Sequence, residues 1–154
     1  MSNHAEIMES RGHYYDFLAR LFEKEMTGAL LQQVSKLDYS VACGQEEMQS
    51  GYALLGQYFA GGVTAGMEDD LAADYAKTFL AAGEAKGNAA FPYESVYTSE
   101  ERLLMQDAWT QVKGIYASHG LALKGDNVDL KEDHIAIELK YMAYLCRHGS
   151  VADQ

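Results

Sequence analysis

Apolar residues recur at intervals of three and four residues through most of this 154-residue chain, the spacing that places them on one face of a helix. Alanine, leucine and methionine total 44 residues against 16 for valine, isoleucine and threonine, and Pro92 is the single proline. Straight-chain residues keep rotamer freedom in helices, whereas β-branched residues lose it. The sequence therefore predicts one all-α domain over residues 1–154, folded as a helical bundle.

Six helices are expected from these apolar stripes. In chain order, the stripes are Tyr15, Leu18, Phe22 and Met26; Leu30, Val34 and Leu37; Met48, Tyr52, Leu55 and Phe59; Leu71, Tyr75 and Phe79; Leu104, Ala108, Val112 and Ile115; and Ile135, Leu139, Met142 and Cys146. Residues 81–91 and 121–129 break the pattern with glycines and small or polar residues, and are expected to be loops.

A capping-box pattern marks the expected start of the fifth helix. Thr98 is followed three residues later by Glu101, which predicts a long helix beginning near Ser99. This helix should stop at Gly120, because glycine tolerates the left-handed conformation of a helix end. Residues 129–132 repeat the pattern before the last helix.

The chain is strongly acidic, with 12 Lys and Arg residues against 23 Asp and Glu, a net charge of −11. A nucleic-acid-binding protein normally presents a basic face to the phosphates, so the charge argues against that class. It also argues against docking on an anionic membrane surface. A basic partner is favoured instead.

Targeting and redox signals point to the cytoplasm. Cys43 and Cys146 form no C-x-x-C pair and are expected to be reduced, buried thiols. Residues 1–6 lack the basic stretch and apolar run of a signal peptide. Residues 48–67 carry no formal charge, but their glycines and polar residues indicate a buried helix and a loop, and not a membrane span.

The common motifs of catalysis are absent from the sequence. It contains no phosphate-binding loop, no dinucleotide-binding glycine pattern and no G-x-S-x-G elbow. None of its histidines has an acidic residue three positions earlier, so the Glu-x-x-His pairs of di-metal bundles are missing too. We therefore expect no catalytic residues, no metal site and no cofactor.

Two short segments carry candidate binding residues. In the first, residues 91–97, Pro92 holds the chain extended and Tyr93 and Tyr97 offer amphipathic rings that suit a peptide-binding face. The alternative is that these rings only seal a loop onto the bundle. Trp109, the single tryptophan, is expected to be a core residue.

The second segment is Asp133-His134, with Glu138 one turn further on. Asp133 would be favoured at the positive end of a helix dipole, and His134 and Glu138 can touch at i and i+4. Two ligands are too few for a metal site. The alternative to a binding role is a capping acid beside a packed histidine.

Several segments together resemble the TorD/DmsD/NarJ family of cytoplasmic chaperones for molybdenum-containing redox enzymes. The similarity runs from about Gly12 to Leu145. It is carried by residues 74–80, 92–97, 118–121 and 132–142. The most specific part is the proline-aromatic-x-Ser-x-aromatic element combined with the Asp-His element, with a helix between them.

The resemblance implies a function. Family members bind the twin-arginine signal peptide of an enzyme precursor and hold the precursor back from export until its molybdenum cofactor is inserted. Asp133 and His134 match the last two positions of the family signature Glu-Pro-x-Asp-His, while Leu130 and Lys131 replace the glutamate and the proline. The implied peptide-binding residues are Tyr93, Glu94, Ser95, Tyr97, Trp109, Asp133, His134 and Glu138, with Asp133 the first choice for an arginine contact.

Family members usually continue past the position of Leu145 with further helices, whereas this sequence ends at Gln154. Missing helices would leave an apolar face uncovered, and large uncovered apolar patches seek partners. We therefore expect a homodimer, with domain exchange as its low-cost form.

The leading hypothesis is thus a non-enzymatic chaperone whose partner is a twin-arginine signal peptide, or the catalytic subunit, of a molybdenum oxidoreductase. The alternative is an assembly protein that contacts a folded metalloenzyme subunit and not its leader peptide. A nucleotide hydrolase is a third class, which no phosphate loop supports.

Overall fold

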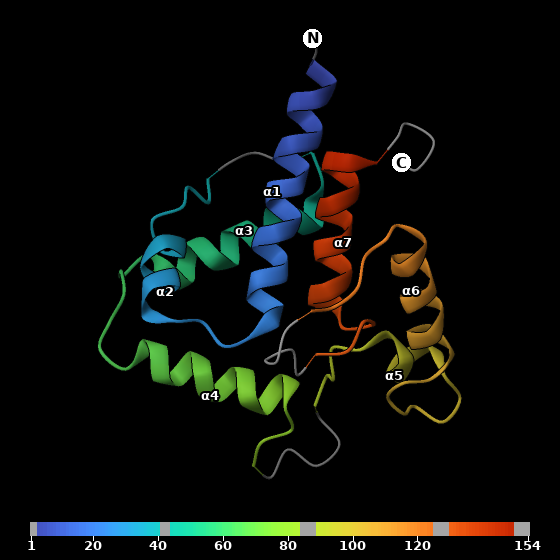
Figure 1. The fold of residues 1–154 in the computed structure, drawn as a ribbon. Helices are drawn as coiled ribbons and strands as arrows, with labels where there is room; N and C mark the ends of the chain where they lie inside the picture. Colours follow the sequence, from blue (N-terminus) through green and yellow to red (C-terminus); the bar gives the residue numbers. More distant parts are fainter. Residues whose placement is uncertain (1–2, 41–43, 84–88, 125–129, 150–154) are drawn as a thin grey trace. The chain divides into compact units, whose positions relative to one another are not determined.

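The computed structural model describes residues 3–40, 44–83, 89–124 and 130–149. Within these ranges the chain forms helices and no strand, which confirms the expected all-α fold (Figure 1). The helices are α1 (Asn3–Glu23), α2 (Gly28–Val34), α3 (Glu46–Phe59), α4 (Met67–Phe79), α5 (Glu94–Thr98), α6 (Asp107–Ser118) and α7 (Ile135–His148). No helix in the described ranges is long and apolar enough to cross a membrane.

The chain divides into two compact units. One unit comprises residues 1–24 and 77–154, and the other comprises residues 25–76. The first unit contains α1, α5, α6, α7 and the end of α4, and therefore all eight candidate binding residues. The expectation of one domain over the whole chain stays a prediction.

In the first unit, α1 and α7 pack side by side (Figure 1). Their buried residues are mostly small, with Gly12 and Ala19 on α1 and Ala136, Ala143 and Cys146 on α7. Small side chains let two helix backbones approach closely, and the buried surface holds the pair together. The free thiol of Cys146 is buried as expected, whereas Cys43 lies outside the described residues.

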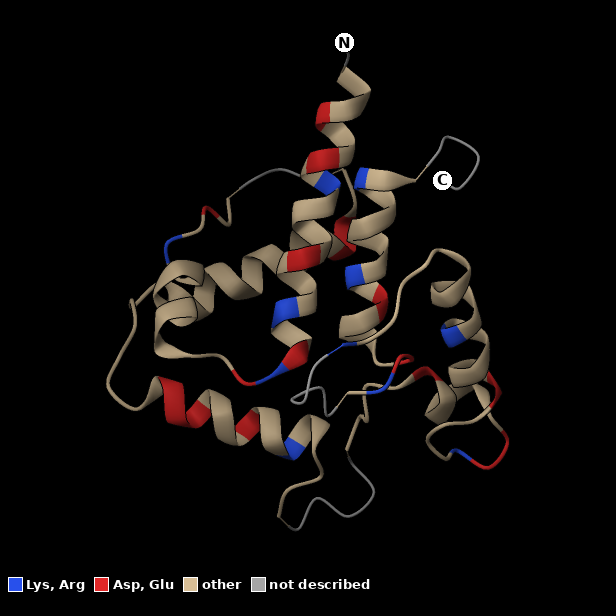
Figure 2. Ribbon diagram, in the orientation of Figure 1, with Lys and Arg blue, Asp and Glu red and all other residues tan. Residues whose placement is uncertain are grey.

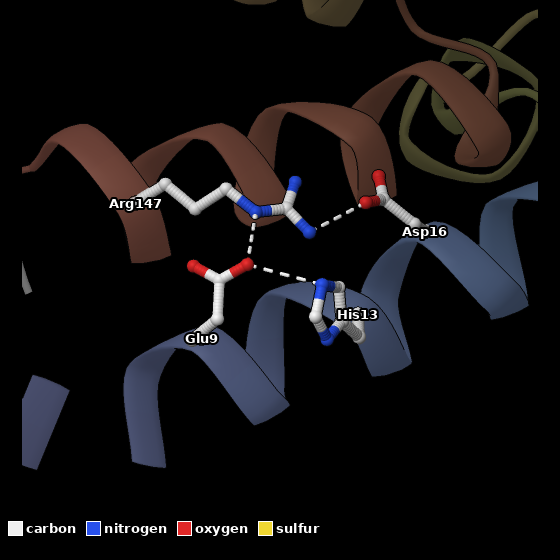
Figure 3. Close-up of polar contacts among 4 residues, drawn as sticks. All are labelled: Glu9, His13, Asp16 and Arg147. Atoms are coloured by element: carbon white, nitrogen blue, oxygen red, sulfur yellow. Dashed lines mark hydrogen bonds and ion pairs between the residues drawn. The ribbon is translucent and has the colours of Figure 1, made fainter. Parts of the chain in front are cut away.

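Ion pairs fix the antiparallel register of α1 and α7. The Arg147 guanidinium reaches Asp16 Oδ2 at 2.7 Å and Glu9 Oε1 at 3.4 Å (Figure 3). Near the other end, Lys140 Nζ lies 2.7 Å from Glu23 Oε1. The early part of α1 thus meets the end of α7, and the end of α1 meets the middle of α7.

The second unit is built around Leu31, Val34 and Phe59, which are buried. The Thr27 hydroxyl oxygen caps α2 by accepting a hydrogen bond from Leu30 N–H at 3.4 Å. The ring of Tyr39 stacks on Phe59 with 6.0 Å between centroids. Of the four residues expected on the inner face of α3, only Phe59 is buried.

The predicted inner faces of the last two helices are wrong in part. Leu104, Ile115, Ile135 and Met142 are exposed. Ala108 and Cys146 are buried as predicted, and the residues buried in place of the exposed ones are Tyr116 on α6 and Ala136, Ile137 and Ala143 on α7. α1 packs closely against a face of α7 that is rich in alanine. A prediction of the inner face from the largest apolar residues therefore gives the wrong face.

The helix expected to start near Ser99 is also wrong. The chain forms the short helix α5, then a turn, and only then α6. The Thr98 and Ser99 hydroxyls donate backward to the carbonyls of Glu94 and Ser95, at 3.0 and 2.7 Å, and so end one helix instead of starting the next. The predicted stop at Gly120 is confirmed, because α6 ends at Ser118 and Gly120 has a φ of 69°.

Candidate functional site

The two candidate segments meet in the first unit. Tyr93 and His134 form an isolated antiparallel β-bridge. Glu94 N–H donates to the Asp133 carbonyl at 2.9 Å, and Ile135 N–H donates to the Pro92 carbonyl at 2.9 Å. The extended backbone that Pro92 favours makes this pairing available. The start of α5 and the start of α7 are therefore held together by main-chain bonds.

Asp133 lies at the centre of this junction and is fully buried. Its Oδ2 accepts hydrogen bonds from Ser95 N–H at 3.1 Å and from the Ser95 hydroxyl, and Ser95 is itself fully buried. The carboxylate thus satisfies a backbone donor in the first turn of α5. Asp133 Oδ1 is buried and has no hydrogen-bond partner among the described residues.

His134 caps the other helix. Its Nδ1 accepts a hydrogen bond from Ala136 N–H at 3.1 Å, so this nitrogen carries no proton. The ring is 2% exposed and meets the edge of Tyr93 with 4.8 Å between centroids. Burial lowers the pKa of His134 to about 4, against the opposing effect of the Asp133 charge. The histidine is therefore neutral at physiological pH.

Glu138 lies one turn into α7 and is half-buried. Its Oε1 is buried without a hydrogen-bond partner in the described part of the chain. Burial, together with the negative charges of Glu94 and Asp133, raises the pKa of Glu138 to about 7. The described residues contain no group of three histidine, cysteine or acidic side chains that could hold a metal.

Trp109 connects α6 to the same junction. Its Nε1 donates to Glu132 Oε2 at 2.6 Å, and the Tyr116 hydroxyl donates to the Glu132 carbonyl at 3.3 Å. The Lys113 ammonium lies 4.7 Å from the centre of the Trp109 ring. Trp109 is half-buried, so it is not the core residue that one expectation gave, and its contact with a peptide stays a prediction.

The eight predicted residues gather on α5, α6 and the start of α7, but they differ in access to solvent. Glu94 and Tyr97 are exposed, Tyr97 by 66%. Tyr93, Trp109 and Glu138 are half-buried. Ser95, Asp133 and His134 are buried, and in this structure no surface of Asp133 is open to an arginine side chain. Asp133 has the capping role that was the alternative to binding.

Sequence reasoning missed the turn between α5 and α6. This turn displays Leu103, Leu104 and Met105, which are exposed by 55%, 46% and 47%. Arg102 and Met105 have φ values of 53° and 60°, unusual for residues with a side chain. No glycine or proline marks the turn, and its residues favour helices, so the sequence offered no signal for it.

The first unit also contains a hollow of about 600 Å³. It is lined mainly by apolar residues and by the rings of Tyr116, Tyr141 and Tyr144. None of the eight predicted residues lines it.

Comparison with known proteins identifies the family. A family model described as nitrate reductase delta subunit matches residues 42–154, which include the whole junction. The chain belongs to this family. Its members include the TorD and NarJ proteins, so the resemblance seen in the sequence is confirmed.

Curated TorD relatives match a part of the chain. The Chaperone protein TorD of two Vibrio cholerae serotype O1 strains, O395 and El Tor Inaba N16961, is 36% identical over 76 residues. That of strain M66-2 is 34% identical over the same length. The aligned segment covers 49% of this chain and 32% of each relative, so it spans about a third of the relatives' length. No solved structure matches the chain.

Proposed function

We propose that this TorD-family chain is a non-enzymatic, cytoplasmic chaperone for the maturation of a molybdenum-containing oxidoreductase. It binds the twin-arginine signal peptide of the precursor and holds the precursor for cofactor insertion before export. The observation that carries the proposal is the junction of α5 and α7. It joins the proline-aromatic element to the Asp-His element, the two elements that carry the family resemblance. Three curated relatives named Chaperone protein TorD support the same class.

The junction suits peptide binding because its buried residues hold the helices together and its exposed residues are free to contact a peptide. Asp133, Ser95 and His134 hold α5 and α7 in place without touching solvent. Glu94 and Tyr97 project from α5, where a carboxylate can pair with arginine and a ring can cover apolar side chains. The net charge of −11 adds a long-range attraction for a cationic leader.

The proposal is tested by calorimetry with a synthetic peptide that carries two adjacent arginines followed by an apolar run. We expect the parent protein to bind it and Tyr97→Ala to weaken the binding. Tyr14→Ala is the matched control, because Tyr14 is 41% exposed on α1 and outside the junction. No binding by the parent protein would overturn the proposal.

One observation favours the alternative of contact with a folded enzyme subunit. Asp133, the expected arginine contact, is fully buried and bonded to Ser95. If the alternative holds, the protein captures a mature catalytic subunit that lacks its leader, and the leader peptide does not compete for it.

Self-association also stays a prediction. It is supported by apolar side chains exposed on α3, where Leu54, Leu55 and Tyr58 are exposed by 65%, 42% and 47%. Light scattering at micromolar concentration should show a dimer. A clean monomer that binds no hydrophobic dye would contradict it.

A further inference from the structure

The turn between α5 and α6 presents an apolar surface with no covering element among the described residues. Leu103, Leu104 and Met105 are each about half exposed, and Tyr97 on α5 is exposed by 66%. Large apolar side chains gathered on one exposed segment mark a contact surface more often than scattered ones do. We call this segment, residues 97–107, the α5–α6 turn.

The α5–α6 turn is anchored at both ends to one buried residue. Ser99 N–H donates to the Ser95 carbonyl at 3.1 Å, and Gln106 N–H donates to the Ser95 hydroxyl oxygen at 3.3 Å. Between these anchors, Arg102 N–H donates to the Ser99 carbonyl at 3.3 Å and the Gln106 side chain donates to the Leu104 carbonyl at 3.1 Å. The apolar side chains therefore project from a held backbone, which lowers the entropy lost on binding.

Acidic residues precede and follow these apolar residues along the chain. Glu100, Glu101 and Asp107 are exposed and line a hollow of about 410 Å³ beside the turn. Figure 2 shows acidic residues on the segment that links α5 to α6. Arg102 is the single cation within residues 97–107, so the segment has a net negative charge. An apolar surface flanked by carboxylates complements a partner that is both cationic and apolar.

We propose that the α5–α6 turn is the docking surface for a peptide with adjacent arginines followed by an apolar run. The arginines pair with Glu100, Glu101 and Asp107, and the apolar run covers Leu103, Leu104 and Met105. This inference rests on the proposed function and deepens it, because it moves arginine recognition from buried Asp133 to exposed carboxylates. The junction then acts as the support that holds the turn in place through Ser95.

The test measures fluorescence anisotropy of a labelled synthetic peptide with two arginines followed by alternating leucine and alanine. The variant Glu100→Gln/Glu101→Gln/Asp107→Asn should raise the Kd about tenfold, the combined effect of three exposed ion pairs. The control Glu46→Gln/Glu47→Gln/Asp69→Asn removes the same charge from exposed positions on α3 and α4, and should change the Kd less than about twofold. A second peptide, with both arginines replaced by glutamine, should bind the parent and the turn variant alike.

The apolar contact is tested separately. Leu103→Ser/Leu104→Ser should raise the Kd about fivefold or more, because two partly exposed leucines lose the area that the peptide would cover. Leu37→Ser/Leu80→Ser is the control, since these leucines are similarly exposed and lie outside the α5–α6 turn and outside α3. Circular dichroism confirms that each variant is folded.

The outcomes separate the two proposals. If the parent protein does not bind the peptide, the proposed function fails. If the parent binds and both turn variants bind as tightly as their controls, the function stands and the docking surface is wrong.

Discussion

At the scale of single residues, Asp133 shows how a candidate binding residue can also have a structural role. The sequence predicts Asp133 as an arginine contact, and in the structure its carboxylate holds Ser95 at the start of α5. A buried carboxylate with two donors from one residue stabilises a junction and is poorly placed to receive a ligand.

Removing the Asp133 carboxylate should destabilise the protein. Asp133→Ala leaves the Ser95 N–H and hydroxyl without their buried partner, so we expect a loss of about 2–4 kcal/mol in the free energy of unfolding. Urea denaturation measures the loss. Asp107→Asn, at an exposed position, should stay within about 0.5 kcal/mol of the parent. Unchanged stability combined with lost peptide binding would instead show that Asp133 is a direct contact.

The half-buried carboxyl of Glu138 should make stability depend on pH. Its pKa is raised from 4.5 to about 7 in the folded protein, so between these values the folded state holds more protons than the unfolded state. The contribution of Glu138 is therefore fully present below about pH 4.5 and is lost as the pH rises through 7. Glu138→Gln has no such loss, and should be more stable than the parent by about 1 kcal/mol at pH 8, after allowance for solvent screening.

The Glu138 effect is measured as the difference in stability between Glu138→Gln and the parent protein. His134 has an opposite slope, because its pKa is lowered from 6.5 to about 4 and its contribution is lost as the pH falls through that range. The slope of His134 is present in the parent and in the variant, so it cancels when urea midpoints are compared at pH 5 and pH 8. An advantage of Glu138→Gln that does not grow with pH would contradict the assignment.

At the scale of elements, the hydroxyl groups of Thr98 and Ser99 lie at the end of α5 and bond to its backbone. The Thr98 and Ser99 side chains donate to the carbonyls of the preceding turn, and the chain leaves the helix before Glu101 can form a capping box. Serine and threonine compete for backbone groups on either side, so the same sequence pattern is compatible with a helix start and with a helix end.

The end of α6 depends on the left-handed backbone of Gly120. A Cβ at this position would meet no atom within 4 Å, so the effect of Gly120→Ala comes from its φ of 69° alone. We expect a loss of about 1 kcal/mol. Gly114→Ala is the matched control, since Gly114 lies inside α6 with nothing within 4 Å of its Cβ, and alanine should stabilise the helix by about 0.5–1 kcal/mol. Urea midpoints with the same sign for both variants would be inconsistent with this account.

At the scale of the whole molecule, net charge governs how fast a cationic leader arrives. The chain carries −11 overall, and exposed charges are screened over about 10 Å at 0.1 M salt. Raising sodium chloride from about 0.05 to 0.5 M should raise the Kd of the twin-arginine peptide roughly tenfold, chiefly by slowing association. Stopped-flow fluorescence resolves the two rate constants. The glutamine-substituted peptide should show little salt dependence, and an equal dependence would argue against steering by the arginines.

The helical class and the position of the candidate segments could be derived from the sequence, because helix periodicity, capping glycine and motif residues are local properties. The end of α6 near Gly120 is an example, whereas the family resemblance pairs residues 92–97 with residues 133–134 as one candidate site. The inner face of α7 and the turn after α5 could not be derived, because they depend on which surfaces meet. Close packing against α1 buries Ala143 and leaves Met142 exposed, and the bonds from Ser95 to Asp133, 38 positions apart, hold the start of α5 beside the start of α7. Such choices depend on contacts distant in sequence, which only the tertiary structure brings together.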